Sequence, residues 1–249
     1  MELAGTVAIV TGAGRGIGRA TALALARRGV VVVLVARTQP EIESVAGEAE
    51  AAGSTALPVV ADVEREDEVA GMVDRALQTY GRVDILVNNA GMSLPERPVV
   101  DTSLADWERI LRVNLTGPFL CARAVLPVMM RQRSGKIVNV ASIGGRVGFA
   151  GIAAYGAAKA GLLHFTASLA AEVKRFGIDV NAVCPSGTDT RLLHETGRAK
   201  GRTNLIRPEE IANVIVFMVS PESSAITGTA IEAYGLSNPL FGPLLSDGR

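Results

Sequence analysis

A tyrosine and a lysine, Tyr155 and Lys159, stand four positions apart and have the side-chain types needed for proton transfer. On a helix, residues at this spacing lie on one face. A carbonyl that accepts a hydride becomes an alkoxide, and a tyrosine hydroxyl can give it a proton. The ordinary pKa of tyrosine is about 10, and a lysine ammonium at about 4 Å favours the phenolate by roughly three pKa units. We therefore expect the charge of Lys159 to outweigh desolvation and to bring the pKa of Tyr155 towards neutral pH.

A serine precedes this pair and extends the possible chemistry. Ser142 follows the predicted strand Ile137–Val140. Its hydroxyl can hold a substrate oxygen and stabilise the charge that develops on it. A tyrosine and a lysine four apart also occur on ordinary amphipathic helices, so the pair gains its meaning from the other motifs that accompany it.

A glycine-rich stretch near the N-terminus has the composition of a phosphate-binding loop. It follows the apolar run Val7–Val10 and opens a helical segment. Glycines permit tight turns and let backbone N–H groups approach a pyrophosphate, and the N-terminus of the following helix adds a partial positive charge. We therefore expect a dinucleotide to bind through Gly12, Gly14, Arg15, Gly16, Ile17 and Gly18.

Apolar runs rich in β-branched residues alternate with helix-length segments along the chain. Such runs are typical of parallel strands that helices cover on both faces. The predicted strands are Val7–Val10, Val30–Val35, Ala56–Val60, Ile85–Val87, Ile137–Val140 and Ile178–Val183. The predicted helices are Gly16–Arg28, Glu41–Ala52, Glu64–Tyr80, Ser103–Arg131, Ala153–Arg175 and one that begins after Pro208. The pattern predicts an α/β fold, a doubly wound parallel sheet of the Rossmann type with helices on both faces.

No linker or internal repeat divides the 249 residues, so we expect a single dinucleotide-binding and catalytic domain over residues 1–249. The polar segment 186–207 follows the sixth predicted strand and would lie over the carboxyl edge of the sheet, where ligands bind in open α/β folds. We interpret it as a lid and call it the lid segment; an ordinary surface connection is the alternative. A tail, residues 236–249, ends the chain.

Composition argues against several other classes of function. Lys and Arg number 25, as do Asp and Glu, so a basic face for nucleic acid is not expected. Cys121, Cys184, His164 and His194 show no metal-ligand spacing, and we expect no metal site. The sequence begins without the pattern of a leader peptide, and no apolar run reaches the roughly 20 residues that span a bilayer. We expect a soluble, cytoplasmic protein that does not act at a membrane.

In their order and placement, these motifs resemble those of the classical short-chain dehydrogenase/reductases, and the 3-oxoacyl-[acyl-carrier-protein] reductase-like members in particular. Asn88-Asn89-Ala90-Gly91 matches the family's motif after the fourth strand, and Tyr155 to Lys159 matches its tyrosine–lysine motif. The resemblance implies that Tyr155 is the acid/base, that Lys159 also holds the nicotinamide ribose, and that Asn114 positions a water for proton relay. It implies further cofactor contacts by Asn89, Ala90, Gly91, Pro185, Thr188 and Thr190.

The end of the second predicted strand indicates which dinucleotide binds. Folds that select NAD place an acidic residue there, whereas an arginine accommodates the 2′-phosphate of NADP. Here Ala36 and Arg37 follow the strand, and Arg15 in the glycine-rich loop can reach the same phosphate. We therefore expect NADP(H) rather than NAD(H). Asp62 and Val63 resemble the family's adenine-contacting pair.

The chain departs from the family pattern in three places, one of which is the lid segment, shorter here than in many relatives. Pro185-Ser186-Gly187 stands where the family has Pro-Gly, so the backbone beside Thr188 and Thr190 can differ. Ala233-Tyr234-Gly235-Leu236 replaces an Asp-Gly-Gly at the end of the last strand.

The sequence thus predicts an NADP(H)-dependent oxidoreductase that moves a hydride between the nicotinamide and a small carbonyl or secondary alcohol. The substrate stays open among carrier-bound acyl chains, sugars, steroids, cyclic alcohols and small ketones. A non-catalytic dinucleotide-binding scaffold or sensor is the alternative function, although it would not need Tyr155 or Lys159. We also expect a homo-oligomer, a tetramer of two-fold symmetry, because Ser103–Arg131 and Ala153–Arg175 are apolar around more of their surface than a sheet can cover.

Overall fold

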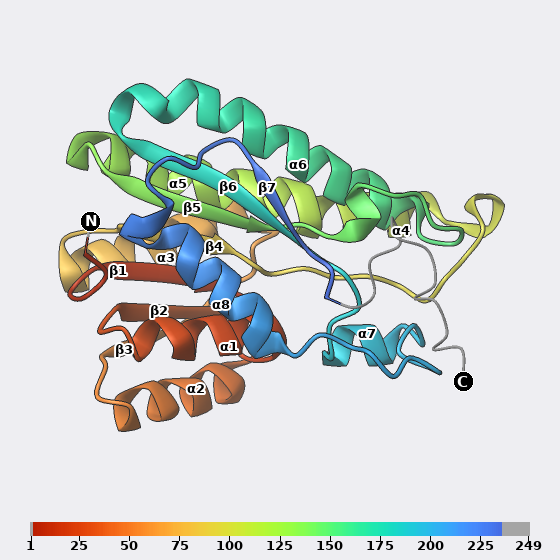
Figure 1. Ribbon diagram of the computed structural model, residues 1–249, viewed down its shortest axis with the longest axis horizontal. Coiled ribbons are helices and arrows are strands. Elements are labelled where there is room, and N and C mark those ends of the chain that lie inside the picture. Colours follow the sequence, from red (N-terminus) through yellow and green to blue (C-terminus); the bar gives the residue numbers. More distant parts are fainter. Residues whose placement is uncertain (1, 236–249) are drawn as a thin grey trace, which may run out of the picture.

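A seven-stranded parallel sheet forms the centre of the molecule (Figure 1). The computed structural model describes residues 2–235. The strand order is β3-β2-β1-β4-β5-β6-β7, and every neighbouring pair is parallel. The strands are β1 (Val7–Thr11), β2 (Val31–Ala36), β3 (Ala56–Val60), β4 (Ile85–Asn88), β5 (Gly135–Val140), β6 (Ile178–Pro185) and β7 (Ala230–Ala233). This confirms the doubly wound Rossmann-type sheet.

Helices cover both faces of this sheet (Figure 1). One layer consists of α1 (Gly16–Ala26), α2 (Gln39–Ala51) and α8 (Pro208–Val219). The opposite layer consists of α3 (Glu66–Tyr80), α4 (Leu104–Leu111), α5 (Gly117–Gln132) and α6 (Ala153–Val173). The short helix α7 (Arg191–Glu195) lies in the lid segment.

The two layers are held by the alternation of side chains along each strand. In β1, Ala8 and Val10 pack towards α1, α2 and α8, whereas Val7 and Ile9 pack towards α3 and α5. All four are almost fully buried. A strand with both faces buried needs apolar residues at every position, which is why the strands were recognisable as continuous apolar runs.

The order of the strands determines where a ligand can bind. The chain runs outwards from β1 through β2 to β3, then returns to place β4 on the other side of β1. In open α/β sheets, the crevice at such a reversal receives the ligand beyond the carboxyl ends of the strands. The glycine-rich loop follows β1, and the segment from Asn89 to Gly91 follows β4, so both lie at this reversal.

The helix predicted over Ser103–Arg131 is continuous but not uniform. It runs from Leu104 to Gln132 as α4, a π-helical turn (Arg112–Thr116) and α5. Among residues 2–235, this is the one helical stretch long and apolar enough by composition to cross a bilayer. Of its most apolar window, 56% is buried inside the fold, as in a core helix, and one such helix is weak evidence for a membrane span.

Candidate active site

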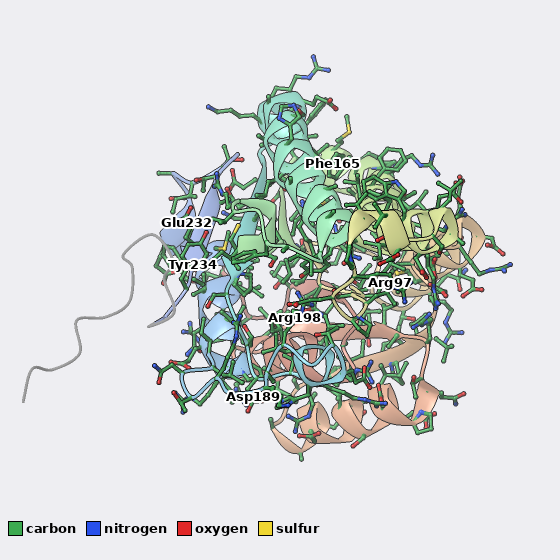
Figure 2. All side chains as sticks on the ribbon, turned by 90° about the vertical axis from the view of Figure 1, so that its right-hand side faces the viewer. Arg97, Phe165, Asp189, Arg198, Glu232 and Tyr234 are labelled. Carbon is green, nitrogen blue, oxygen red and sulfur yellow. The ribbon has the colours of Figure 1, made fainter. Side chains whose placement is uncertain are left out.

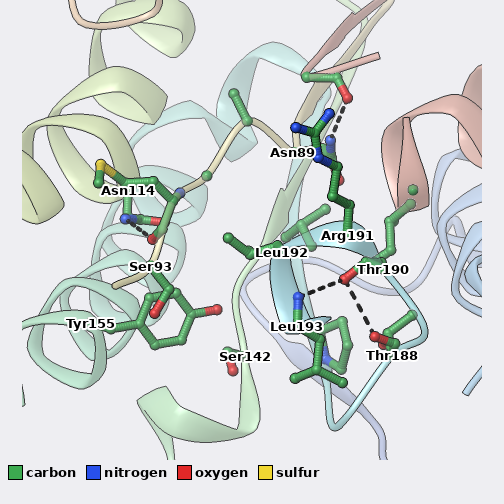
Figure 3. Close-up of a pocket in the computed structure, with 18 of the residues that line it drawn as sticks. Asn89, Ser93, Asn114, Ser142, Tyr155, Thr188, Thr190, Arg191, Leu192 and Leu193 are labelled. Carbon is green, nitrogen blue, oxygen red and sulfur yellow. Dashed lines mark hydrogen bonds between the residues drawn. The ribbon is translucent and has the colours of Figure 1, made fainter. Parts of the chain in front are cut away.

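A cavity of about 820 Å³ opens at the carboxyl edge of the sheet. It is large for a small-molecule site, since ligand pockets usually have roughly 300–1,000 Å³. Of the predicted catalytic and cofactor-binding residues, Gly18 alone does not line it. The fold therefore brings together residues from eight separate segments of the chain. Figure 3 shows part of this cavity, with Tyr155 and Ser142 on one side and the lid residues Leu192 and Leu193 on the other.

The glycines of the loop after β1 are required by close backbone contacts. Gly12 has a φ of +64°, and a Cβ there would lie 2.8 Å from Nδ2 of Asn89. A Cβ on Gly18 would overlap the carbonyl oxygen of Gly12. Gly18, in the first turn of α1, therefore packs closely against the backbone of the loop and does not line the cavity. Backbone N–H groups without side-chain cover, next to a helix N-terminus, fit the pyrophosphate of a dinucleotide.

Asn89 connects this loop to the end of β4. Its side-chain amide donates to the carbonyl oxygens of Thr11 at 2.9 Å and of Gly12 at 3.1 Å. In return, the Thr11 hydroxyl oxygen accepts from the backbone N–H groups of Asn89 and Ala90, each at 3.0 Å. These four hydrogen bonds hold the two cofactor-facing loops in one arrangement.

Asn114 is fully buried in the π-helical turn between α4 and α5. Its Nδ2 donates to the carbonyl oxygens of Met92 at 2.8 Å and of Ile110 at 2.9 Å, and its Oδ1 accepts from the N–H of Met92. A Cβ on Gly91 would lie only 3.0 Å from that Oδ1. The π turn was not predicted from the sequence. Such turns interrupt the regular hydrogen bonding of a helix and are frequent at functional sites.

Tyr155 and Lys159 lie on the cavity side of α6, one turn apart. The ammonium nitrogen of Lys159 donates to the carbonyl oxygen of Val140 at 2.8 Å. Ser142 follows β5, and its hydroxyl oxygen accepts from the N–H of Gly144 at 3.1 Å. Ser142 and Tyr155 lie near each other in Figure 3. The two hydroxyls are thus supplied by two rigid elements that meet at the sheet edge.

The expected effect of Lys159 on Tyr155 is wrong for this structure. Burial raises the pKa of Tyr155, and the opposing contributions of the Ser142 hydroxyl and the Arg198 charge are smaller. Burial also lowers the pKa of Lys159 to about 8. The expectation from the sequence assumed a Lys159 cation near the protein surface, whereas in the folded chain Lys159 is buried and Tyr155 is partly buried. The strongest cationic influence on Tyr155 comes instead from the lid.

The lid segment supplies functional candidates that sequence reasoning missed. Arg198 lies with its guanidinium carbon 5.4 Å from the centroid of the Tyr155 ring. It donates to the hydroxyl of Ser93, which follows β4, and to that of Thr196. Arg191 reaches across the cavity to within 3.8 Å of Glu41 in α2. A polar segment placed after the sixth strand was the available signal, but the sequence did not show which of its arginines would face the tyrosine.

The region predicted to hold the 2′-phosphate contains carboxylates as well as arginines. Arg15 lies 3.7 Å from Glu41, and Arg37 lies 3.6 Å from Asp62. Both arginines remain well exposed, with 49% and 62% of their side chains accessible. Their guanidinium groups are therefore held loosely at the cavity wall. Glu41 was not among the predicted site residues.

Three comparisons place the chain among known proteins. The family model described as short chain dehydrogenase matches residues 6–201. The chain is 40% identical to a 3-oxoacyl-[acyl-carrier-protein] reductase of Synechocystis sp., over 94% of this chain and 97% of that protein. It is 42% identical to the cis-4-hydroxycyclohexanecarboxylate dehydrogenase of Sinomonas cyclohexanicum, over 92% and 95%.

A solved structure agrees with these sequence relatives. The 3-ketoacyl-(acyl-carrier-protein) reductase from Brucella melitensis, complexed with NADH, superposes with a TM-score of 0.88 at 35% identity, covering 94% of this chain and 99% of that one. The match extends over nearly all of both chains, so the two proteins have the same fold. This chain belongs to the classical short-chain dehydrogenase/reductase family of oxidoreductases.

Proposed function

We propose that this protein is an NADP(H)-dependent oxidoreductase that interconverts a carbonyl and a secondary alcohol, with Tyr155 as the acid/base. The observation that carries the proposal is the shared cavity. It is lined by the glycine-rich loop at one end and by Ser142, Tyr155 and Lys159 at the other. A dinucleotide extended along the switch point would reach from one group to the other.

The side chains suit proton transfer to a substrate oxygen. NADPH, when bound, supplies the hydride. The Tyr155 hydroxyl, kept protonated by burial, gives its proton to the oxygen of the new alcohol, and Ser142 holds that oxygen by a hydrogen bond. Lys159 lines the cavity, and its ammonium group is held by the hydrogen bond to the Val140 carbonyl oxygen. Asn114 connects the π turn to the loop at Met92 by two hydrogen bonds. By family resemblance, it also positions the water that relays protons.

The remaining residues of the cavity suit the dinucleotide. Gly12, Gly14, Gly16 and Ile17 line its pyrophosphate end, and Asp62 and Val63 its adenine end. The preference for the 2′-phosphate rests on Arg37 and Arg15, whose exposed guanidinium groups can turn towards it. At the nicotinamide end, Asn89, Ala90 and Gly91 face Pro185, Thr188 and Thr190. Ser186 donates to the carbonyl of Tyr234, so the departure from the family motif ties this corner to the segment after β7.

We propose a small-molecule substrate for one catalytic domain that acts in the cytoplasm as a homo-tetramer. The lid segment, residues 186–207, would cover the substrate. The predicted tail, residues 236–249, lies outside the described residues. The alternative of a non-catalytic scaffold or sensor is disfavoured because all four predicted catalytic residues line the same cavity.

A direct assay tests the proposal. The oxidation of NADPH and of NADH is followed by absorbance with a panel of ketones, 3-oxoacyl thioesters and cyclic ketones, and the reverse reaction with the corresponding alcohols. We expect turnover with at least one carbonyl and a higher kcat/KM with NADPH. Tight binding of NADPH with no turnover of any panel member would favour the scaffold or sensor.

A further inference from the structure

Arg198 is a cation next to the proposed acid/base, and the proton transfer described above does not require it. It follows α7 in the lid segment, is partly buried and lines the cavity. Its guanidinium carbon is 5.4 Å from the centroid of the Tyr155 ring. Figure 2 places Arg198 near the centre of this view of the molecule, between the lid and the layer of helices above it. A substrate whose oxygen contacts Tyr155 must therefore lie beside this charge.

Within the described part of the chain, two hydrogen bonds hold the Arg198 guanidinium. Nε donates to the Thr196 hydroxyl at 3.0 Å and Nη2 to the Ser93 hydroxyl at 2.9 Å. A guanidinium has five N–H donors, so about three remain for other acceptors. Within residues 2–235, Arg198 forms no ion pair. Partly buried arginines are usually paired with an anion, since desolvating an uncompensated charge is costly.

Nearby carboxylates in the lid already have other partners. Glu195 is paired with Arg191, and Asp189 with His194. The two hydroxyl contacts of Arg198 come from different segments, Ser93 after β4 and Thr196 after α7, and they fix the plane of the fork. A guanidinium fixed in this way at the wall of a cavity matches the planar geometry of a carboxylate.

We propose that the substrate carries a carboxylate a few bonds from the reacting carbon and that Arg198 binds it. This inference rests on the proposed function, which supplies the position of the reacting oxygen at Tyr155. A 3-oxoacyl thioester has a neutral thioester where such a carboxylate would lie. Arg198 therefore favours free oxo acids or hydroxy acids over carrier-bound acyl chains as substrates of this chain.

A matched substrate pair tests the contact. 4-Oxocyclohexanecarboxylate and its methyl ester present the same ring ketone with and without the negative charge. We expect Arg198→Gln to lower kcat/KM for the carboxylate by about tenfold to 100-fold, chiefly through KM, and to leave the ester within about threefold. Arg198→Lys keeps the charge without the planar fork and should give an intermediate loss for the carboxylate. Lys200→Gln removes one positive charge from an exposed position of the same segment and should leave the ratio of the two substrates unchanged.

Equal losses for carboxylate and ester in Arg198→Gln would overturn the proposal, because Arg198 would then act through Tyr155 or the lid. An equal loss of kcat/KM for the carboxylate in Lys200→Gln would also overturn it, because the general positive charge of the segment would then explain the preference without a direct contact. Calorimetric titration of cyclohexanecarboxylate, which cannot react, gives a readout without turnover: wild type should bind it, and Arg198→Gln should not. If the wild type reduces only neutral thioesters and ketones, this inference fails while the proposed function stands. If no carbonyl is reduced with either cofactor, the proposed function fails, and binding of the unreactive carboxylate still decides the role of Arg198.

Discussion

The ammonium nitrogen of Lys159 lies 5.7 Å from the centroid of the Tyr155 ring, one turn along the same helix. Lys159 is buried and Tyr155 is partly buried, and the Val140 carbonyl oxygen accepts a hydrogen bond from Lys159. Burial opposes the charged form of each group: it raises the pKa of Tyr155 and lowers that of Lys159 to about 8. The tyrosine is therefore kept as a proton donor, which suits the reduction of a carbonyl.

Replacing Tyr155 by phenylalanine tests this assignment. The change removes only the hydroxyl, so we expect kcat to fall by about 10²-fold to 10⁴-fold while the Kd for NADPH changes little. Steady-state kinetics and fluorescence titration measure the two effects. Tyr80→Phe, at the end of α3 and outside the cavity, is the matched control. Wild-type turnover in Tyr155→Phe would remove Tyr155 from the mechanism.

The lowered pKa of Lys159 predicts a dependence of stability on pH. Below its folded pKa of about 8, Lys159 is charged in both the folded and the unfolded state, and the cost of burying the charge is fully present. Between that pH and its ordinary value of 10.5, the unfolded chain binds the proton and the folded chain does not, so the contribution of Lys159 to stability increases with pH. Relative to Lys159→Met, the wild type should gain about 2 kcal/mol between about pH 7 and about pH 9.5.

Urea denaturation of the protein without cofactor, at several pH values, measures this difference. Lys200→Met, an exposed lysine in the lid segment, should track the wild type at every pH. A difference between wild type and Lys159→Met that stays constant with pH would show that Lys159 is not desolvated. The loss of its hydrogen bond to Val140 is present at all pH values and does not mimic the predicted trend.

These two residues show what sequence patterns can and cannot predict. The spacing of Tyr155 and Lys159 predicted a shared helix face because helical geometry is local. The sign of the pKa shift on Tyr155 was wrong because it depends on which distant segments cover the pair. Arg198 was missed for the same reason, since the path of the lid segment is set by tertiary contacts such as that with Ser93.

The choice of cofactor is tested by removing the charge of Arg37. Arg37→Gln should raise the Kd for NADPH by about tenfold or more and that for NADH by much less, because only NADPH carries the 2′-phosphate. Fluorescence titration with both dinucleotides gives the ratio. Arg65→Gln, whose parent arginine is paired with Glu68 outside the cavity, is the control. Equal changes for the two dinucleotides would assign the selection to other residues.

The close contact between Gly18 and the Gly12 carbonyl oxygen predicts that one added methyl group lowers both stability and NADPH binding. In Gly18→Ala the new Cβ would overlap the Gly12 carbonyl oxygen, so we expect a loss of about 1–3 kcal/mol in stability and much weaker NADPH binding. Gly47→Ala in α2 meets no atom within 4 Å and should be neutral or stabilise by up to about 1 kcal/mol. Urea denaturation and NADPH titration compare the two. Similar behaviour of both variants would contradict the tight packing of the loop.

The strands were predictable for a reason that the loops do not share. Each of β1, β2 and β4 is buried on both faces, and this requirement produces an apolar run that can be read directly. The π turn at Asn114 carries no such signature, because it arises where the asparagine side chain bonds to Met92 in another segment. Local patterns thus predicted the scaffold, and contacts between segments determined the details of the site.

Exposed aromatic and aliphatic side chains support the predicted tetramer. Phe119 on α5 is 41% exposed and lies edge-on to Phe165 on α6, at 6.2 Å between ring centroids. Leu104, at the start of α4, is 70% exposed. Large apolar side chains grouped on one layer of helices usually mark a protein interface. The same helices from a second copy, related by a two-fold axis, would cover this surface.

Light scattering at micromolar concentration, applied to the wild type and to two variants, tests both the number of chains in the assembly and the position of the interface between them. Four chains of 25.9 kDa give the expected mass, and a second two-fold contact would involve the region of Phe217 on α8, which is 41% exposed. Phe119→Glu places an uncompensated charge in the proposed interface of α5 and α6, so we expect it to halve the mass without unfolding the protein. Val60→Glu alters another exposed apolar side chain, at the end of the edge strand β3, and should leave the mass at the wild-type value. A wild-type mass of one chain would rule out the tetramer, and a tetramer that persists in Phe119→Glu would move the interface away from α5 and α6.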